Sequence, residues 1–361
     1  MSPRISEALV IRGKTLRNRI IMPPLVCFNW GDDDGMETVS RAEHYGRRAR
    51  GGVGLIIVEA TAVSREGRLH QTELGLWSDQ HIPQFRRIAE ACHAHGVPVI
   101  VQLVHAGSKA VGPDRVSSSA VADEVRPARA MSEAEIQQFK QDYLRAAQRA
   151  AEAGLDGIEI HGAHGYLLSQ FSSAQTNQRS DDYGGSLPKR QRLPLELATE
   201  LRRSLPVEFI LGYRFGVNDP SLQEDLDLAG RLIEAGVDML NVSAGIGADS
   251  LTPPADFAFS PITWMGVAMK AALTAAGHSV PVACVFGITR PEQAKALLDG
   301  NQTDLVAVGR GLLADPDWTN KALDGQSVDE CLHCPGGCRY RTDGKLCPVQ
   351  LAAANTAKAT G

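Results

Sequence analysis

Eight short and almost continuous apolar runs are the feature that most constrains how this chain folds. They occupy residues 19–25, 53–60, 98–107, 157–162, 208–216, 239–245, 281–287 and 304–311. Runs that are apolar throughout, rather than at alternate positions, are typical of parallel strands covered on both faces. The pattern therefore predicts an α/β fold whose strands are buried between other layers.

Helical patterns separate the runs. The clearest lie at residues 81–96, 132–154 and 290–300. The second begins with the capping box Ser132-x-x-Glu135, and the joins at Gly154 and Gly236 share the order Ala-Gly-x-Asp before the next apolar run. Eight such β-then-α units predict a single (β/α)8 TIM barrel. An open doubly wound sheet is disfavoured, because no Gly-x-Gly-x-x-Gly follows the first run.

The two ends of the chain differ from this repeating pattern. Residues 1–18 are expected to form a hairpin that caps the barrel floor, and the barrel domain is expected to span residues 1–325. Residues 326–361 form a Cys-rich tail, whose last segment, LAAANTAKATG (351–361), is expected to be frayed.

Charge and hydropathy exclude several classes of function. The chain carries 37 basic and 42 acidic residues, a net charge of −5, with no Lys/Arg run, so it is a poor candidate for binding nucleic acid or an anionic membrane. No apolar stretch has the length of a membrane span, and the N-terminus lacks the apolar core of a signal peptide. We therefore expect a cytoplasmic protein whose partners are small molecules.

Polar and Gly-containing segments lie at or just after the points where the parallel strands would end. They are Met22-Pro23-Pro24, Glu59-Ala60, Gln102, His161, His164, Arg214, Gly287 and Gly309-Arg310. In a TIM barrel the functional residues gather at the carboxyl ends of the strands. These residues are therefore predicted to share one site.

The sharpest motif in this set is His-x-x-His-x-Tyr, formed by His161, His164 and Tyr166. Two imidazole N–H groups can hold a carbonyl oxygen while a phenol beside them supplies a proton. Conjugate reduction needs this combination. A metal-binding pair and two solvent-exposed histidines are equally open on spacing alone.

Two turns near the end of the barrel region are suited to an anion. Phe286 and Gly287 lie in one, Gly309 and Arg310 in the other, and each turn leads into a helical pattern. Backbone N–H groups in such turns can face a phosphate, and the last two units are the usual phosphate site of a TIM barrel.

Several longer motifs resemble the Old Yellow Enzyme family, the NADH:flavin oxidoreductases or ene-reductases. They are LRNRIIMPPL, GGVGLIIVEATAV, VQLVHAG, EIHGAHGYLLSQF, DDYGGS and AVGRGLLADPDW, spread from about residue 4 to about residue 320. The resemblance implies FMN as cofactor, NAD(P)H as co-substrate and, as is usual for the family, a homo-oligomer.

The same resemblance implies roles for individual residues. Residues matching those that bind FMN are Pro23, Pro24, Ala60, Gln102, Arg214, Phe286, Gly287, Gly309 and Arg310. His161 and His164 match the pair that binds the substrate carbonyl, and Tyr166 matches the proton donor. The implied reaction is reduction of the activated C=C bond of an α,β-unsaturated carbonyl or nitro compound.

One departure from the family pattern follows the first apolar run. Family members often carry a Cys or Thr there that tunes the flavin potential. Here Val26 takes that position and Cys27 comes one residue later. A Val side chain forms no hydrogen bond, and a lone Cys is most often a buried structural thiol, so flavin tuning is left open.

The tail holds four of the seven cysteines, and they are Cys331, Cys334, Cys338 and Cys347. Their spacing resembles the [4Fe-4S] motif of the larger 2,4-dienoyl-CoA reductase branch, although the last gap is shorter here. An iron–sulfur cluster, a zinc site and free thiols all stay open. For the nearby Arg339 and Arg341 we expect a surface role, although C-terminal arginines of some relatives reach a neighbouring subunit's active site.

Two other functions are compatible with these motifs. One is oxidation or demethylation of an amine, for which Trp30, Trp77 and Trp264 would supply aromatic walls. The other is an electron-transfer subunit of a larger reductase, with the cysteine tail as its docking point. The natural substrate and the choice between NADH and NADPH are not readable from the sequence.

Overall fold

Eight parallel strands close into a barrel in the computed structural model, which describes residues 4–219, 221–247 and 251–360, with side chains up to residue 355. The strands are β3 (Ile20–Met22), β4 (Leu55–Ala62), β5 (Val99–Val104), β8 (Gly157–Gly162), β9 (Ile210–Val217), β10 (Met239–Ala244), β11 (Val282–Val285) and β12 (Leu305–Ala307). They pair in chain order, and β12 closes on β3. Each apolar run overlaps one of these strands, so the predicted (β/α)8 barrel is confirmed.

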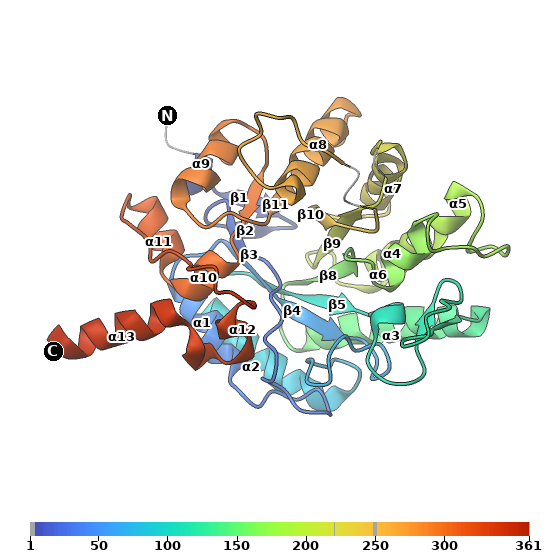
Figure 1. Cartoon of the computed structure of the whole chain (residues 1–361), viewed down its shortest axis with the longest axis horizontal. Helices are drawn as coiled ribbons and strands as arrows, with labels where there is room; N and C mark the ends of the chain where they lie inside the picture. Colours follow the sequence, from blue (N-terminus) through green and yellow to red (C-terminus); the bar gives the residue numbers. More distant parts are fainter. Residues whose placement is uncertain (1–3, 220, 248–250, 361) are drawn as a thin grey trace.

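Helices surround the barrel (Figure 1). They are α1 (Arg41–Arg50), α2 (Ile82–His93), α3 (Glu133–Glu152), α4 (Leu167–Ser172), α5 (Leu187–Arg190), α6 (Arg192–Ser204), α7 (Gln223–Glu234), α8 (Pro261–Ala275), α9 (Pro291–Asp299), α10 (Arg310–Ala314) and α11 (Trp318–Leu323). The predicted capping box starts α3, where the Ser132 hydroxyl accepts from the Glu135 N–H and the Glu135 carboxylate accepts from the Ser132 N–H.

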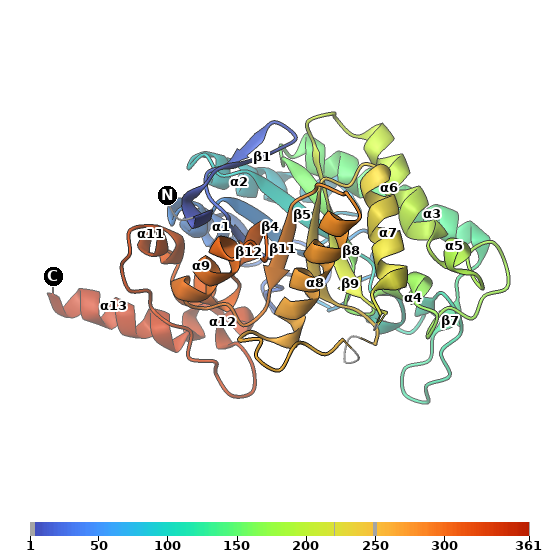
Figure 2. The ribbon, with the colours of Figure 1, turned by 90° about the horizontal axis from the view of Figure 1, so that it is seen from above.

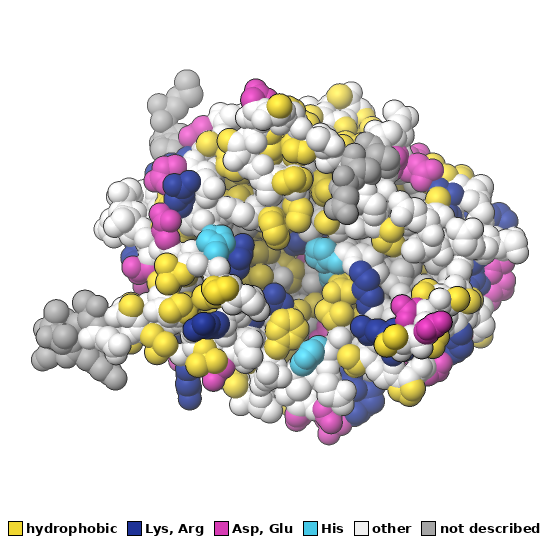
Figure 3. All heavy atoms as spheres, in the orientation of Figure 1, with side chains coloured by type: hydrophobic (Ala, Val, Ile, Leu, Met, Phe, Trp, Pro, Cys, Tyr) yellow, Lys and Arg dark blue, Asp and Glu magenta, His cyan; other side chains and the backbone are white. Residues whose placement is uncertain are grey.

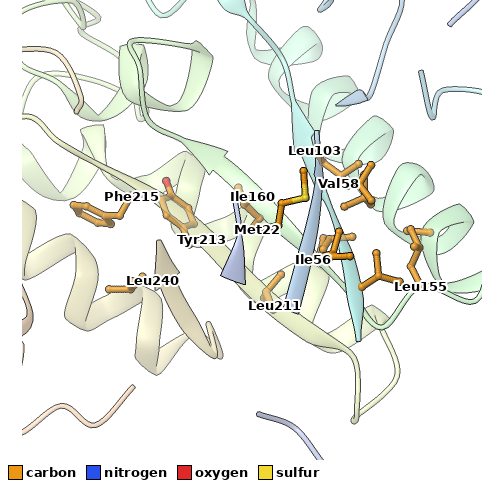
Figure 4. Packing of buried hydrophobic residues seen from close by; sticks show 14 of the residues in the cluster. Met22, Ile56, Val58, Leu103, Leu155, Ile160, Leu211, Tyr213, Phe215 and Leu240 are labelled. Atoms are coloured by element: carbon orange, nitrogen blue, oxygen red, sulfur yellow. The ribbon is translucent and has the colours of Figure 1, made fainter. Parts of the chain in front are cut away.

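The alternation of side chains along each strand explains why the runs are apolar throughout. In β4, Leu55 and Ile57 point into the barrel, where they join one buried cluster. Ile56 and Val58 belong to the second cluster, which includes residues of the surrounding helices. Figure 4 shows Ile56 and Val58 among the buried side chains of this second cluster, with Leu103 close by. Because both faces of the sheet are covered, both sets of positions must be apolar.

A hairpin closes the barrel floor, as predicted. Strands β1 (Leu9–Ile11) and β2 (Lys14–Leu16) pair antiparallel. Ile11 and Leu16 are buried against the residues that fill the barrel interior. Residues 1–3 lie outside the described residues.

Aspartates that precede strands join neighbouring units at this floor. Asp156 accepts a hydrogen bond from the Val99 N–H at 2.8 Å, and Asp238 accepts from the Leu211 N–H at 2.8 Å. Lys14 of the hairpin lies 3.0 Å from the Asp156 carboxylate. The repeated Ala-Gly-x-Asp joins therefore link adjacent strands and dock the hairpin, which leaves the opposite end of the barrel for the site.

The Cys-rich tail packs against α1 through α12 (Arg339–Thr342). Tyr340 is buried, and its hydroxyl lies 2.9 Å from Nδ1 of His44. Beyond it, α13 (Pro348–Thr360) projects away from the barrel (Figure 2). Residues 351–360, for which the sequence predicts a frayed end, are helical as part of α13, and this alanine-rich segment has high helix propensity. Residue 361 lies outside the described residues.

None of the helices in the described ranges is long and apolar enough to cross a membrane.

Candidate active site

A cavity of about 610 Å³ opens where the barrel strands end. Figure 3 shows this face hollowed near its centre, with His and Lys/Arg side chains around the hollow. The walls contain the residues assigned to cofactor and substrate from the sequence, which are Pro23, Pro24, Ala60, Gln102, His161, His164, Tyr166, Arg214, Phe286, Gly287, Gly309 and Arg310. Met22 and Glu59, also expected in this site, are buried and do not line the cavity. The fold thus brings together segments that lie far apart in the chain.

The two histidines face each other. His161 ends β8, and its Nε2 lies 3.1 Å from Nδ1 of His164. His164 and Gly165 both adopt positive φ angles, of 60° and 67°, so the chain turns sharply after the strand. This turn brings Tyr166 back over the pair, with its ring centroid 4.8 Å from that of His161.

The hydrogen-bond partners of the pair define its tautomers. Nδ1 of His161 accepts from the Ala163 N–H, so the His161 proton sits on Nε2 and is donated to His164. Nε2 of His164 then carries the other proton, 2.9 Å from the Ser243 hydroxyl. The Ser243 hydroxyl can also donate to Nε2, which moves the His164 proton to Nδ1. In that second tautomer, each of the two facing nitrogens carries an N–H group, and both can donate to a ligand oxygen instead of to the other ring.

Both imidazoles are neutral at physiological pH. Burial lowers the pKa of His161 well below its ordinary value, and His164 and Arg214 lower it further. Burial, followed by Arg214 and Lys109, lowers the pKa of His164 to about 3. A neutral pair suits binding of a carbonyl or enolate oxygen, because each ring needs only one N–H.

These shifts predict how stability changes with pH. The folded state keeps His164 neutral down to about pH 3, whereas the unfolded state protonates it below about 6.5, so stability is lost as the pH falls through that window. Between pH 7 and 4.5 we expect the wild type to lose about 2–3 kcal/mol more unfolding free energy than His164→Asn. Urea unfolding at both pH values measures the difference. Parallel losses in the two proteins would contradict the assignment.

Tyr166 is protonated at neutral pH. Burial raises the pKa of Tyr166 to about 12, Glu73 adds to the rise, and Arg341 opposes it. Its hydroxyl forms no hydrogen bond with any residue in the described ranges. A protonated phenol without a protein partner is available as a proton donor to a bound molecule.

A layer of buried polar groups lies beneath the cavity. The Glu159 carboxylate accepts from Gln102 Nε2 at 2.7 Å and from Asn241 Nδ2 at 3.0 Å. Because Nε2 of Gln102 donates to Glu159, the carbonyl oxygen of the amide is free to accept from a molecule in the cavity. Glu159 therefore orients the Gln102 amide as an acceptor.

Arg214 carries buried N–H groups that lack a hydrogen-bond partner within the described ranges. It is 5% exposed, and its Nε and Nη1 atoms have no partner among the described residues. Burial lowers the pKa of Arg214, whereas Glu159 raises it. Unpaired buried donors are costly to leave unsatisfied, so this guanidinium is built to meet a bound acceptor.

The two predicted phosphate turns also carry unused donors. Phe286 and Gly287 have positive φ angles of 86° and 76°, which turn the chain after β11. Within the described chain, the N–H groups of Gly287 and Gly309 donate no hydrogen bond, and Arg310 forms no ion pair. The turns after the seventh and eighth barrel strands thus present donors and one free cation to the cavity.

The two residues Val26 and Cys27, which follow β3, point to different surroundings. Val26 lines the cavity, whereas Cys27 does not and is 1% exposed. The Cys27 N–H donates to the Glu59 carboxylate at 2.8 Å, and burial raises the pKa of the Cys27 thiol. Cys27 is therefore a buried structural thiol, and the side chain that faces the cavity here is an apolar valine.

The four tail cysteines gather around a separate small cavity of about 20 Å³. All four thiols are free, and no group of three or more His, Cys, Asp or Glu side chains in the described ranges is placed to hold a metal ion. Cys338 and Arg310 line both this cavity and the large one. The tail is thus part of the wall of the barrel site.

Three residues of the site escaped the sequence reasoning. Ser243 and Glu159 are strand residues whose partners come from other units of the barrel, and no local pattern marks them. Arg341, for which a surface role was expected, lines the large cavity of its own chain. An arginine close to a strand-end cavity can be located only once the docking of the tail is known.

Sequence comparison connects this geometry with known proteins. A sequence model of the NADH:flavin oxidoreductase / NADH oxidase family matches residues 6–328. The chain belongs to this family. It is an NAD(P)H-dependent flavin oxidoreductase, and FMN is the cofactor that the family implies.

Among curated relatives, an NADPH dehydrogenase of Halalkalibacterium halodurans is 37% identical over 331 residues, covering 89% of this chain and 94% of that protein. An NADH oxidase of Thermoanaerobacter brockii is 36% identical over 343 residues, covering 90% of this chain. The chain spans about half of that longer oxidase, 51% of its length. The shared region is therefore the barrel and most of this chain.

Solved structures in the family have the same architecture. Morphinone reductase in complex with tetrahydroNAD superposes with a TM-score of 0.76 at 28% identity, covering 95% of this chain and 97% of that one. An Old Yellow Enzyme homologue from Zymomonas mobilis superposes with a TM-score of 0.76 at 25% identity, covering 91% and 95%.

The unpaired groups of this site fit the flavin nucleotide that the family binds. The Arg214 guanidinium and the Gln102 carbonyl oxygen offer a donor and an acceptor on one side of the cavity. The turns at Gly287 and Gly309, together with Arg310, offer donors for a phosphate on another. A planar ring with a hydrogen-bonding edge and a phosphate tail matches both sets.

Proposed function

We propose that this family member is an ene-reductase, which reduces the activated C=C bond of α,β-unsaturated carbonyl or nitro compounds with NAD(P)H. The observation that carries the proposal is the His161–His164 pair, 3.1 Å apart, with the Tyr166 ring 4.8 Å from His161 in one cavity. Two neutral donors that meet at one point, beside a protonated phenol, suit an oxygen that becomes an enolate next to a carbon that needs a proton.

The barrel residues hold FMN, which when bound supplies the hydride for this reduction. Pro23, Pro24 and Ala60 would place backbone against the bound ring, and the Gln102 carbonyl oxygen would accept from its hydrogen-bonding edge. Arg214 places a positive charge beside the ring, where it stabilises added negative charge.

The phosphate of the cofactor is held by the last two units of the barrel. The positive φ angles at Phe286 and Gly287 turn backbone N–H groups toward the cavity, and Gly309 does the same after β12. Arg310 adds a cation that no carboxylate of the described chain neutralises. With the ring and the phosphate of the cofactor bound at these residues, the His161 side of the cavity is left for the substrate.

On that side, the substrate oxygen accepts from Nε2 of His161 and from Nδ1 of His164. Ser243 allows this, because its hydroxyl can donate to Nε2 of His164 and so keep the His164 proton on Nδ1. Tyr166 then gives its proton to the α-carbon. The protein thus binds the oxygen with two neutral donors and supplies the proton from a third residue.

Steady-state turnover tests the proposal. Under anaerobic conditions, we expect NADPH or NADH consumption to depend on added cyclohex-2-enone, and the product to be cyclohexanone in equal amount. Dioxygen must be excluded, because it also reoxidises reduced flavins. NAD(P)H consumption that is unaffected by any enone or nitroalkene, in FMN-loaded protein, would contradict the proposal.

The amine alternative finds less support in this geometry. Within the described residues, none of Trp30, Trp77 and Trp264 lines the cavity. A cationic amine would also meet arginines in the wall rather than carboxylates. Bleaching of the flavin by an amine without NAD(P)H would reverse this preference.

For the tail, residues 326–361, we propose free thiols rather than a cluster or a zinc site. The four cysteines share a cavity, but the described positions of their side chains do not form a metal-binding group, so the residues do not fit a [4Fe-4S] cluster as they stand.

Metal analysis tests this reading of the tail. We expect protein purified without oxygen to contain iron and zinc well below one atom per chain, since no ligand set is preformed. Mass spectrometry of metals and thiol titration of the unfolded protein measure this. About four iron atoms per chain, with matching acid-labile sulfide, would instead show a cluster and favour the electron-transfer alternative.

A further inference from the structure

Arg341 brings a positive charge from the tail into the wall of the barrel cavity. Its Nε atom donates to the Val26 carbonyl oxygen at 2.6 Å, and its guanidinium carbon lies 4.7 Å from the Phe28 ring centroid. These contacts fix the side chain at the edge of the cavity and leave both terminal nitrogens without a partner among the described residues. Arg341 also lies beyond the region that the family model matches, residues 6–328.

The charges in this wall do not balance. Three arginines, Arg214, Arg310 and Arg341, line the cavity, whereas no Asp or Glu of the described chain does so. None of the three forms an ion pair with a described carboxylate. The proposed FMN site uses Arg214 and Arg310, so Arg341 is the cation without an assigned partner.

A second cation stands beside Tyr166. The Lys109 ammonium donates to the His164 carbonyl oxygen at 2.6 Å and lies 5.5 Å from the centroid of the Tyr166 ring. It has no carboxylate partner within the described chain. Arg341 also acts on Tyr166, since it lowers the pKa of that phenol against the effect of burial.

The acidic group that acts on Tyr166 does not offset these cations at neutral pH. Glu73 is buried, and burial raises the pKa of its carboxyl to about 8. At pH 7 this carboxyl is mostly protonated and uncharged. Arg341 in the cavity wall and Lys109 beside the Tyr166 ring are therefore two uncompensated positive charges close to the proton donor.

We propose that Arg341 is the centre of an anion subsite, to which the nearby Lys109 adds positive charge, and that this subsite selects substrates carrying a carboxylate or phosphate at the end remote from the reducible C=C bond. The inference rests on the proposed function and names its substrate class. The two free terminal nitrogens of Arg341 match the geometry of a carboxylate or a phosphate. The Lys109 ammonium, 5.5 Å from the centroid of the Tyr166 ring, adds a second positive charge near the proton donor.

A matched pair of substrates tests the subsite. trans-Cinnamaldehyde and 4-carboxy-trans-cinnamaldehyde share the same enal, and the second adds a remote carboxylate. In wild-type protein we expect kcat/KM for the carboxylate to exceed that for the neutral enal by about tenfold or more, the range that charge-assisted hydrogen bonds give. This ratio should fall as salt rises from 50 mM to 0.5 M, because exposed charges are screened.

Variants then assign the effect to Arg341. Arg341→Gln is expected to bring the ratio close to one, and Arg341→Lys to give an intermediate value, because lysine keeps the charge but not the paired donors. Lys345→Gln removes a charge from the same tail outside the cavity, so the ratio should stay at the wild-type value. Far-UV circular dichroism and FMN content are compared for every variant.

The outcomes separate the two proposals. If wild-type protein reduces both enals with equal kcat/KM, the subsite is wrong and the ene-reductase proposal stands. If neither enal nor cyclohex-2-enone is reduced, both are wrong. Repeating the assays with NADH and NADPH distinguishes the source of the anion. Loss of NADPH preference in Arg341→Gln with an unchanged substrate ratio would assign the cation to the coenzyme phosphate and overturn the substrate subsite.

Discussion

Tyr166→Phe is expected to slow enone reduction by about 10²–10⁴-fold, the usual contribution of a positioned proton donor. The substitution removes one hydroxyl and keeps the ring, whose centroid lies 4.8 Å from that of His161. Since Tyr166 acts only after the enone has bound, reduction of the flavin by NADPH should keep its rate. Stopped-flow measurement of the two half-reactions separates these effects.

Tyr183→Phe provides the matched control. Tyr183 is buried, and its hydroxyl bonds to Gln137 and Glu196 outside the cavity. This variant loses the same atom, so its enone turnover should equal that of the wild type. If Tyr166→Phe also turned over normally, with solvent deuterium still at the α-carbon, another group would be the proton donor.

The second large effect is expected at the histidine pair. Replacing His161 or His164 with Ala should lower kcat/KM for cyclohex-2-enone by about 10²–10³-fold, as loss of one donor to a developing oxyanion does. The double variant should lose less than the product of the two single effects, because the rings form one hydrogen-bonded unit at 3.1 Å. His95→Ala, at an exposed position, is the control and should be unaffected.

Binding separates this role from a structural one. The pair variants should also lose affinity for a para-substituted phenol, measured by the change in flavin absorbance, while FMN remains bound. Unchanged phenol affinity with reduced turnover would show that the histidines do not hold the oxygen of the ligand.

Much of the barrel was predictable because its signals are local. Apolar runs mark strands covered on both faces, and the capping box at Ser132 marks the start of α3. Parallel strands bring their carboxyl ends together at one end of the barrel. Polar residues near the ends of the strands, such as Gln102 and Arg214, were therefore expected to share one site there. The cavity contains both.

The contacts that complete the site were not predictable in this way. Ser243 meets His164 across 79 positions of sequence, and Glu159 meets Gln102 across 57, only because the barrel closes. Arg341 meets Val26 across 315 positions, after the tail docks on α1. Such pairings depend on tertiary packing, and a strand interior containing Ser or Glu carries no local sign of its partner.

The most direct test of the account is an anaerobic visible spectrum of FMN-loaded protein, recorded alone, after one equivalent of NADPH and after cyclohex-2-enone. The account predicts that the flavin absorbance bleaches with NADPH and returns in full with the enone. A flavin that bleaches but stays reduced in the presence of enones and nitroalkenes would contradict it.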